Sequence, residues 1–149
     1  MIIREAVKND ITAWSQMRTD LWPDTDDQHV AAINEYFLGS SNDIVKAWMA
    51  VSNAEVIGFL ELNIRSFAEG SRSKEIPYIE AWYIKPAYRG NSYGALLMQQ
   101  AEQWAVSCGY SELASDTQTD NDISIAMHKH LGFFETDRIV CFLKRLKNA

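Results

Sequence analysis

Cysteine is scarce in this sequence: Cys108 and Cys141 are the only two among 149 residues. Two isolated cysteines make neither a disulfide framework nor a metal-ligand pattern, so we expect free thiols in a reducing compartment and no bound metal. The sequence also lacks any run of 18 apolar residues, and the acid Glu5 follows closely on its first apolar residues. We therefore expect a soluble, cytoplasmic protein with no membrane partner.

Glycine and proline are few, seven and three residues, which excludes collagen-like and linker-like chains. Basic residues are outnumbered by acids, 14 against 20, so the formal net charge is -6. This sign does not suit a protein that binds by neutralising phosphates, and we expect no nucleic acid partner. The acids cluster in two stretches, which favours a cationic partner or simply two solvated loops: Asp20, Asp24, Asp26 and Asp27, and Asp116, Asp120 and Asp122.

Apolar residues are plentiful at 47%, enough for one buried core, so we expect a single domain over residues 1–149. Apolar periodicity and turn residues predict these elements in order: a strand near 2–7, helices at 11–21 and 30–38, strands at 47–51 and 56–64 joined by a hairpin, a strand at 78–84, a helix opening within 89–95 and closed by Gly109, a strand at 112–115, a helix at 123–131 and a strand at 139–143. This order predicts an α+β, mixed α/β fold with helices on both faces of one sheet.

One segment joins a strand, a glycine-containing loop and the start of a helix. Gly90 and Gly94 let the backbone approach a ligand closely, and the N–H groups of residues 91–95 lie at a helix N-terminus, where the helix dipole favours phosphate. Arg89 adds a positive charge. The segment predicts an anion site, although such a turn can also serve only as a connection. Neither the Walker nor the G-x-G-x-x-G spacing is present, which disfavours an ATPase or a dinucleotide enzyme.

The spacing Arg89-x-x-x-x-Gly94-Ala95 after a strand that ends before Pro86, with Asn121 and Leu131-Gly132-Phe133 further on, resembles the GCN5-related N-acetyltransferases. The resemblance implies a central, mostly antiparallel, splayed sheet and acetyl-CoA as co-substrate. In that family the loop holds the pyrophosphate, and here Ser92 replaces its usual middle glycine. The implied cofactor contacts are Trp82, Tyr83, Ile84, Arg89, Gly90, Asn91, Ser92, Tyr93, Gly94, Ala95 and Asn121.

More narrowly, Leu21-Trp22-Pro23-Asp24 with His29, Glu80 in the strand before Pro86, and Met127-His128 are similar to the aminoglycoside 6'-N-acetyltransferases. This resemblance implies acetyl transfer to the 6'-amine of an aminoglycoside by direct attack in a ternary complex, conferring resistance. It also implies a homodimer, to which the β-rich C-terminal segment can contribute a strand. The implied substrate contacts are Trp22, Phe67, Glu80, Asp116 and Asp137.

Glu80 is unusual because it is an acid inside an apolar strand. Strand alternation places it on the face of Trp82 and Ile84, opposite Tyr83, where it is either solvated or functional. The resemblance makes Glu80 a substrate contact and the candidate general base, acting directly or through water; the alternative is that Glu80 only anchors the substrate and a water chain accepts the proton. His128 stands where many relatives have a tyrosine that protonates the CoA thiolate, so it is either the acid or a packing residue.

The other candidate residues can also be explained by purely structural roles. Asp116 suits a turn or helix cap, Asp137 suits a surface position, and Trp22 suits the core, where we place Trp14, Trp48 and Trp104.

Cys108 and Cys141 are interpreted as small buried hydrophobes, so no acetyl-cysteine is expected. Two rival functions remain, an N-acetyltransferase for another small polyamine or peptide amine, and a non-enzymatic module that binds acyl-CoA or antibiotic.

Overall fold

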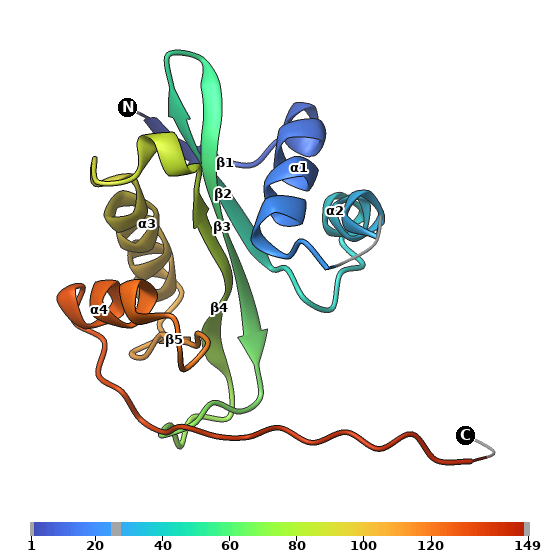
Figure 1. Cartoon of the computed structure of the whole chain (residues 1–149), viewed down its shortest axis with the longest axis vertical. Helices are drawn as coiled ribbons and strands as arrows, with labels where there is room; N and C mark the ends of the chain where they lie inside the picture. The colour runs from blue at the N-terminus through green and yellow to red at the C-terminus, as the bar shows by residue number, and fades with distance from the viewer. Residues whose placement is uncertain (1, 25–27, 148–149) are drawn as a thin grey trace. The chain divides into compact units, whose positions relative to one another are not determined.

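The central feature of the fold is a five-stranded sheet in the order β1-β2-β3-β4-β5 (Figure 1). The computed structural model describes residues 2–24 and 28–147. The chain divides into two units, Met1–Asp116 and Thr117–Ala149, and the sheet belongs to the first. Its strands are β1 (Ile2–Glu5), β2 (Lys46–Ser52), β3 (Glu55–Arg65), β4 (Ile76–Ile84) and β5 (Ala114–Ser115).

Helices cover both faces of this sheet. Figure 1 shows α1 (Ile11–Leu21) and α2 (His29–Leu38) on one side and α3 (Tyr93–Ser107) on the other. The second unit contains α4 (Asp122–His130). The mixed architecture predicted from the sequence is confirmed. No helix among residues 2–24 and 28–147 is both long and apolar enough to cross a membrane.

Pairing in the sheet is mostly antiparallel, as expected. β1, β2, β3 and β4 form three successive antiparallel pairs, and β4 pairs with β5 in parallel. The predicted hairpin between β2 and β3 is a two-residue turn in which Asn53 and Ala54 both have positive φ, 48° and 67°. That backbone matches the right-handed twist of paired strands, and asparagine tolerates it better than most residues. The turn sets the pairing of β2 and β3 next to it, Ser52 with Glu55.

The core of the first unit lies on both sides of the sheet because β2 and β3 are apolar on both faces. On the α1 and α2 side, Trp14, Met17 and Ile33 are fully buried against Phe59 of β3. On the other side, α3 contributes buried side chains, and the rings of Trp48 and Trp104 meet at 6.3 Å. Trp14 and Trp48 are therefore core residues as predicted, and Trp104 is half-buried beside Trp48.

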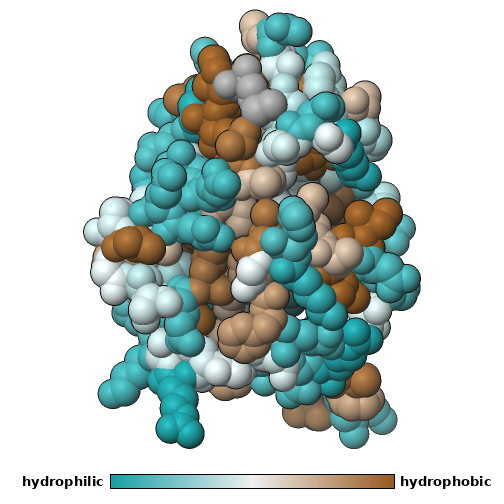
Figure 2. Space-filling view, turned by 90° about the vertical axis from the view of Figure 1, so that its left-hand side faces the viewer, coloured by the Kyte–Doolittle hydropathy of each residue, from teal (hydrophilic) through white to brown (hydrophobic). Residues whose placement is uncertain are grey.

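The last predicted strand, at 139–143, is wrong. Residues 133–146 form neither helix nor strand. β-rich composition alone does not make a strand, because an isolated extended segment leaves its N–H and C=O groups without ladder partners. Several large apolar side chains of this segment stay exposed: Phe134, Ile139, Val140, Phe142, Leu143 and Leu146. Elsewhere exposed apolar residues such as Val106 are interspersed with polar ones, and the face in Figure 2 has this mixed character.

A buried charge cluster ties α1 to β3. The carboxylate of Glu61 is 1% exposed and accepts a hydrogen bond from Trp14 Nε1 at 2.8 Å. Arg18 Nε lies 3.2 Å from the same oxygen. Burial raises the pKa of Glu61, and the Arg18 guanidinium opposes that rise. Arg18 Nε and Nη1 are buried and make no hydrogen bond to any residue that the structure describes, so Arg18 depends on the charge of Glu61.

We expect Glu61→Gln to lower the free energy of unfolding by about 3 kcal/mol, because it leaves the Arg18 charge buried and unpaired. Glutamine still offers an oxygen to Trp14 Nε1, so the loss of unfolding free energy measures the effect of removing the Glu61 charge. Glu55→Gln is the matched control, since Glu55 is exposed and pairs with Lys85 at 3.5 Å only on the surface. Urea denaturation measures both variants, and equal stabilities would contradict the assignment.

Candidate active site

The carboxyl half of β4 has an open edge. β5 pairs with β4 only at Tyr78↔Ala114 and Ile79↔Ser115, whereas β3 pairs with β4 as far as Gly58↔Ile84. Between Glu80 and Ile84, therefore, β4 is held on its β3 side and has no β5 partner. This is the splay expected from the sequence. It leaves the backbone at Trp82, Tyr83 and Ile84 beside a gap in the ladder, although Ile84 O already accepts a hydrogen bond from Arg89 Nε at 2.8 Å.

The loop after β4 has a left-handed backbone at two positions. Gly90 has a φ of +82° and Ser92 a φ of +69°, both left-handed, and α3 begins at the next residue, Tyr93. Ser92 thus adopts a left-handed conformation, which glycine takes most readily. Its side chain makes no capping hydrogen bond, so the first N–H groups of α3 stay available to a ligand. Asn91 Nδ2 donates to Tyr88 O at 3.3 Å, which closes the loop.

Gly94 occupies a position where β4 and α3 approach closely. Trp82 Nε1 donates to Gly94 O at 3.0 Å, and a Cβ at Gly94 would lie 3.4 Å from Trp82 Cζ2. The side that a Cβ would take is therefore filled by the Trp82 indole. Arg89 is fixed in the same region, with its Cζ 5.4 Å from the ring centre of Tyr83. Trp82 and Arg89 together join the loop to the open edge of β4.

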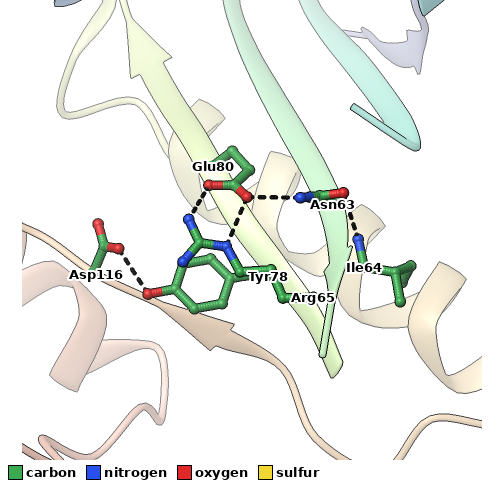
Figure 3. A network of polar contacts seen from close by, with 6 residues as sticks. All are labelled: Asn63, Ile64, Arg65, Tyr78, Glu80 and Asp116. Carbon is green, nitrogen blue, oxygen red and sulfur yellow. Dashed lines mark hydrogen bonds and ion pairs between the residues drawn. The ribbon is translucent and has the colours of Figure 1, made fainter. Parts of the chain in front are cut away.

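Glu80 is the centre of a polar network on β3 and β4 (Figure 3). Arg65 Nε and Nη2 donate to its two oxygens at 2.9 and 2.6 Å, and Asn63 Nδ2 donates to Oε2 at 3.0 Å. The Arg65 guanidinium also lies over the Tyr78 ring, 3.7 Å from its centre. The hydrogen bond to Glu80 is the largest cause of a raised pKa of Arg65. The network holds a carboxylate and a cation together at the strand where β5 departs.

A β-bulge explains the position of Glu80. Glu61 pairs with Ala81 and Leu62 pairs with Ile79, so Glu80 is the extra residue of β4 between two ladder pairs. Strict alternation fails across such an extra residue. The prediction that Glu80 shares a face with Trp82 and Ile84 rested on that alternation. What places the carboxylate is instead its contact with Asn63 and Arg65 at the end of β3.

Asp116, predicted as a substrate contact, lies at the other end of the same network. Its Oδ2 accepts a hydrogen bond from the Tyr78 hydroxyl at 2.7 Å, and its side chain is exposed. Burial and this hydrogen bond raise the pKa of Tyr78. The Tyr78 hydroxyl is therefore neutral at physiological pH. Tyr78 connects Asp116, which its hydroxyl contacts, to Arg65, which lies over its ring.

The aromatic candidates lie at the ends of other elements. Trp22 follows the last residue of α1, is half-buried, and stacks on His29 with ring centres 6.0 Å apart. Phe67 follows β3 and is 61% exposed. Asp20 and Asp24 are exposed near Trp22, whereas Asp26 and Asp27 lie outside the described residues.

Three candidates belong to the second unit. Asn121 caps α4, because its Oδ1 accepts a hydrogen bond from Ser124 N at 3.1 Å. His128 Nδ1 lies 2.8 Å from Ser124 O, and its ring meets Phe133 at 5.2 Å. Since a carbonyl only accepts, this contact places a proton on Nδ1. Asp137 is exposed, and its Oδ1 accepts from Arg138 N at 2.8 Å.

The cysteine prediction is wrong as to burial. Both thiols are exposed, since Cys108 directly follows α3 and Cys141 lies in the 133–146 segment that pairs with no strand. In the part of the chain that the structure describes, no group of histidine, cysteine and acidic side chains is arranged to hold a metal ion.

The residues that the sequence did not single out are Asn63, Arg65 and Tyr78. Asn63 and Arg65 are two apart on β3, so alternation already places them on one face. Their meeting with Glu80 depends on the register of the β3–β4 pair, which no local pattern encodes.

Comparison with known proteins adds independent information. The family model described as the acetyltransferase (GNAT) family matches residues 11–133. An aminoglycoside N(6')-acetyltransferase type 1 from Klebsiella aerogenes is 37% identical over 147 residues, with 97% of this chain and 97% of the relative covered. A protein of the same name from Acinetobacter baumannii is 33% identical over 147 residues, with coverages of 98% and 99%.

Solved structures agree with these sequence relatives. The apo aminoglycoside antibiotic 6'-N-acetyltransferase AAC(6')-IG from Acinetobacter haemolyticus has a TM-score of 0.87 at 32% identity, with 99% of this chain and 100% of that chain covered. AAC(6')-Iy in complex with the bisubstrate analogue CoA-S-monomethyl-acetylneamine has a TM-score of 0.88 at 30% identity, with coverages of 97% and 98%. A family match over most of the chain and relatives that align nearly end to end lead to one conclusion: this chain belongs to the acetyltransferase (GNAT) family.

Proposed function

We propose that this protein transfers the acetyl group of acetyl-CoA to the 6'-amine of aminoglycosides, and thereby confers resistance to them. The observation that carries the proposal is the position of Glu80, an anchored carboxylate on β4 at the point where β5 stops pairing. An acceptor amine bound there lies beside an open strand edge that can take the amides of the acetyl donor. The aminoglycoside 6'-N-acetyltransferases among its relatives support the choice of acceptor.

Acetyl-CoA is assigned to the loop and the open edge of β4. The first N–H groups of α3, with Arg89, suit the pyrophosphate, because a helix N-terminus favours anions. The segment that receives it is 89–95. The backbone of Trp82, Tyr83 and Ile84 is assigned to the pantetheine amides and the thioester carbonyl, and Asn121 to a further contact. A backbone N–H at that carbonyl would stabilise the developing oxyanion.

The acceptor site is acidic and aromatic. Glu80 and Asp116 supply negative charge for the ammonium groups of an aminoglycoside, and we assign Asp137 to a further ammonium group. Trp22 and Phe67 supply aromatic faces, on which cations and sugar rings pack well. This composition fits a polycation, as does the net charge of -6.

The proposed chemistry is direct transfer in a ternary complex. The 6'-ammonium loses one proton to Glu80, its nitrogen lone pair forms the bond to the thioester carbon, and the carbon–sulfur bond breaks with its electron pair on sulfur. The attacking nitrogen gives up its second proton to solvent as the neutral amide forms. His128 is assigned as the acid that protonates this thiolate. Because Nδ1–H is engaged by Ser124 O, His128 would donate from Nε2 as the imidazolium.

A steady-state assay of CoA release tests this function against its rivals. We expect turnover with aminoglycosides that carry a 6'-amine, and at least about 100-fold lower kcat/KM with an aminoglycoside that has a 6'-hydroxyl, because the anchored amine is then missing. Polyamines and peptide amines are the comparison substrates. Turnover only with these would indicate another N-acetyltransferase, and tight binding without CoA release would indicate a binding module.

Gly94 gives a test of the donor site alone. We expect Gly94→Val to weaken acetyl-CoA binding at least about tenfold, because branched carbons there displace the Trp82 indole that joins β4 to α3. Gly94→Ala is the matched control, since its Cβ reaches only ordinary contact distance from Trp82. Isothermal titration calorimetry measures both, with circular dichroism to check folding. Equal acetyl-CoA affinities of Gly94→Val and Gly94→Ala would contradict the assignment of the 89–95 loop to the pyrophosphate.

We further propose a cytoplasmic homodimer. Free, exposed thiols are typical of a reducing compartment. The exposed apolar side chains of residues 133–146 need a covering surface, and an extended segment of this composition suits strand addition to a second copy.

Sedimentation of the full chain tests the dimer. We expect a dimer at micromolar concentration and a monomer for Phe142→Glu, because a charge at a side chain that is 91% exposed costs little unless a partner buries it. Val106→Glu, on α3 and outside the segment, is the control and should stay dimeric. A monomeric parent, or a dimeric Phe142→Glu, would contradict the proposal.

A further inference from the structure

Arg65 occupies a position that the proposed function does not use. It lies between the two carboxylates assigned to the acceptor: it donates twice to Glu80 and stacks on Tyr78, whose hydroxyl donates to Asp116 (Figure 3). The negative charge of Asp116 also contributes to the raised pKa of Arg65. The acceptor site therefore contains a fixed cation of its own, beside the carboxylate that is to bind a cationic substrate.

The geometry leaves one place on Glu80 for a substrate. A carboxylate offers about four lone-pair positions, two on each oxygen. Oε2 accepts from Asn63 Nδ2 and Arg65 Nε, and Oε1 accepts from Arg65 Nη2 alone. Among the described residues, then, the unused position lies on Oε1. A two-pronged guanidinium contact fixes the plane of the carboxylate and so fixes the direction of that position.

The charge of Arg65 has a second consequence. A carboxylate beside an amine favours the ammonium form, which binds well but cannot attack. A guanidinium close to the same amine acts oppositely, since like charges disfavour protonation. At neutral pH neither Tyr78 nor Glu61 supplies a positive charge that could replace that of Arg65. Tyr78 is neutral, and its hydroxyl donates to Asp116. The charge of Glu80 raises the pKa of Glu61, but the Glu61 carboxylate is paired with Arg18.

We propose that Arg65 is a positioning residue of the acceptor site, which aims Glu80 Oε1 at the reacting amine and offsets the carboxylate charge so that the amine gives up its proton more readily. The inference rests on the proposed function. It assigns Arg65 two separable effects, one from its two-pronged geometry and one from its charge. The proton leaves the ammonium by way of Oε1 and passes on to solvent, and the electron pair of the broken N–H bond stays on nitrogen for the attack.

Two substitutions separate these effects. Arg65→Met retains an apolar stem over Tyr78 but removes the charge, so we expect the acidic limb of the kcat profile for aminoglycoside to move up by about one pH unit. Arg65→Lys keeps the charge but offers no fork, so we expect an unmoved pH profile and a kcat lowered about tenfold. The KM for acetyl-CoA should stay unchanged in both variants.

Arg72→Met is the matched control, because Arg72 is an exposed arginine in the segment after β3. It should leave both the pH profile and kcat at parental values. An unmoved acidic limb in Arg65→Met, with a lower melting temperature as its only change, would reduce Arg65 to a structural ion pair and overturn the proposal. A parent that acetylates no aminoglycoside would instead overturn the proposed function, and the parental profile of the same series separates the two outcomes.

Discussion

The backbone pairing of β4 is the constraint on which the candidate site depends. β4 pairs with β3 along its length, and with β5 only at Tyr78 and Ile79. One strand is therefore held firmly on one side and open on the other. The loop at 89–95 follows β4 after one short 3-10 helix, Pro86–Tyr88, and the Trp82–Gly94 hydrogen bond joins α3 back to the strand. An open strand edge and an anchored acid therefore occur on the same strand.

Electrostatics gives the acceptor side its character. The chain is acidic overall, but Glu80 and Glu61 are each paired with an arginine, Arg65 and Arg18. Glu61 is fully buried and serves the fold, because its pairing with Arg18 and Trp14 ties α1 to β3. The Glu80 side chain is 19% exposed and its partner Arg65 40%, so this pair remains within reach of a ligand. Two acids on neighbouring strands, each paired with an arginine, thus suit different roles, according to their burial.

The sequence predicted what local patterns encode. Two β-rich runs in succession predicted the hairpin, apolar spacing predicted α1 and α3, and Glu80 was conspicuous as an acid among apolar neighbours. Long-range register decided the rest: the bulge at Glu80 and the approach of Arg65 depend on how β3 meets β4. The strand at 139–143 failed for the same reason, since a strand needs a neighbour that composition does not specify. The substrate and cofactor residues remain predictions, supported by geometry at Glu80 and at the loop.

The central claim is that Glu80 anchors one particular amine of the acceptor beside the open edge of β4. Two-dimensional NMR of the acetylated product tests it most directly, with an aminoglycoside that carries several primary amines, since the correlation from the acetyl carbonyl identifies the nitrogen that received it. The account predicts a single product acetylated at the 6'-nitrogen. Acetyl groups spread over several amines, or placed at a single different one, would contradict it.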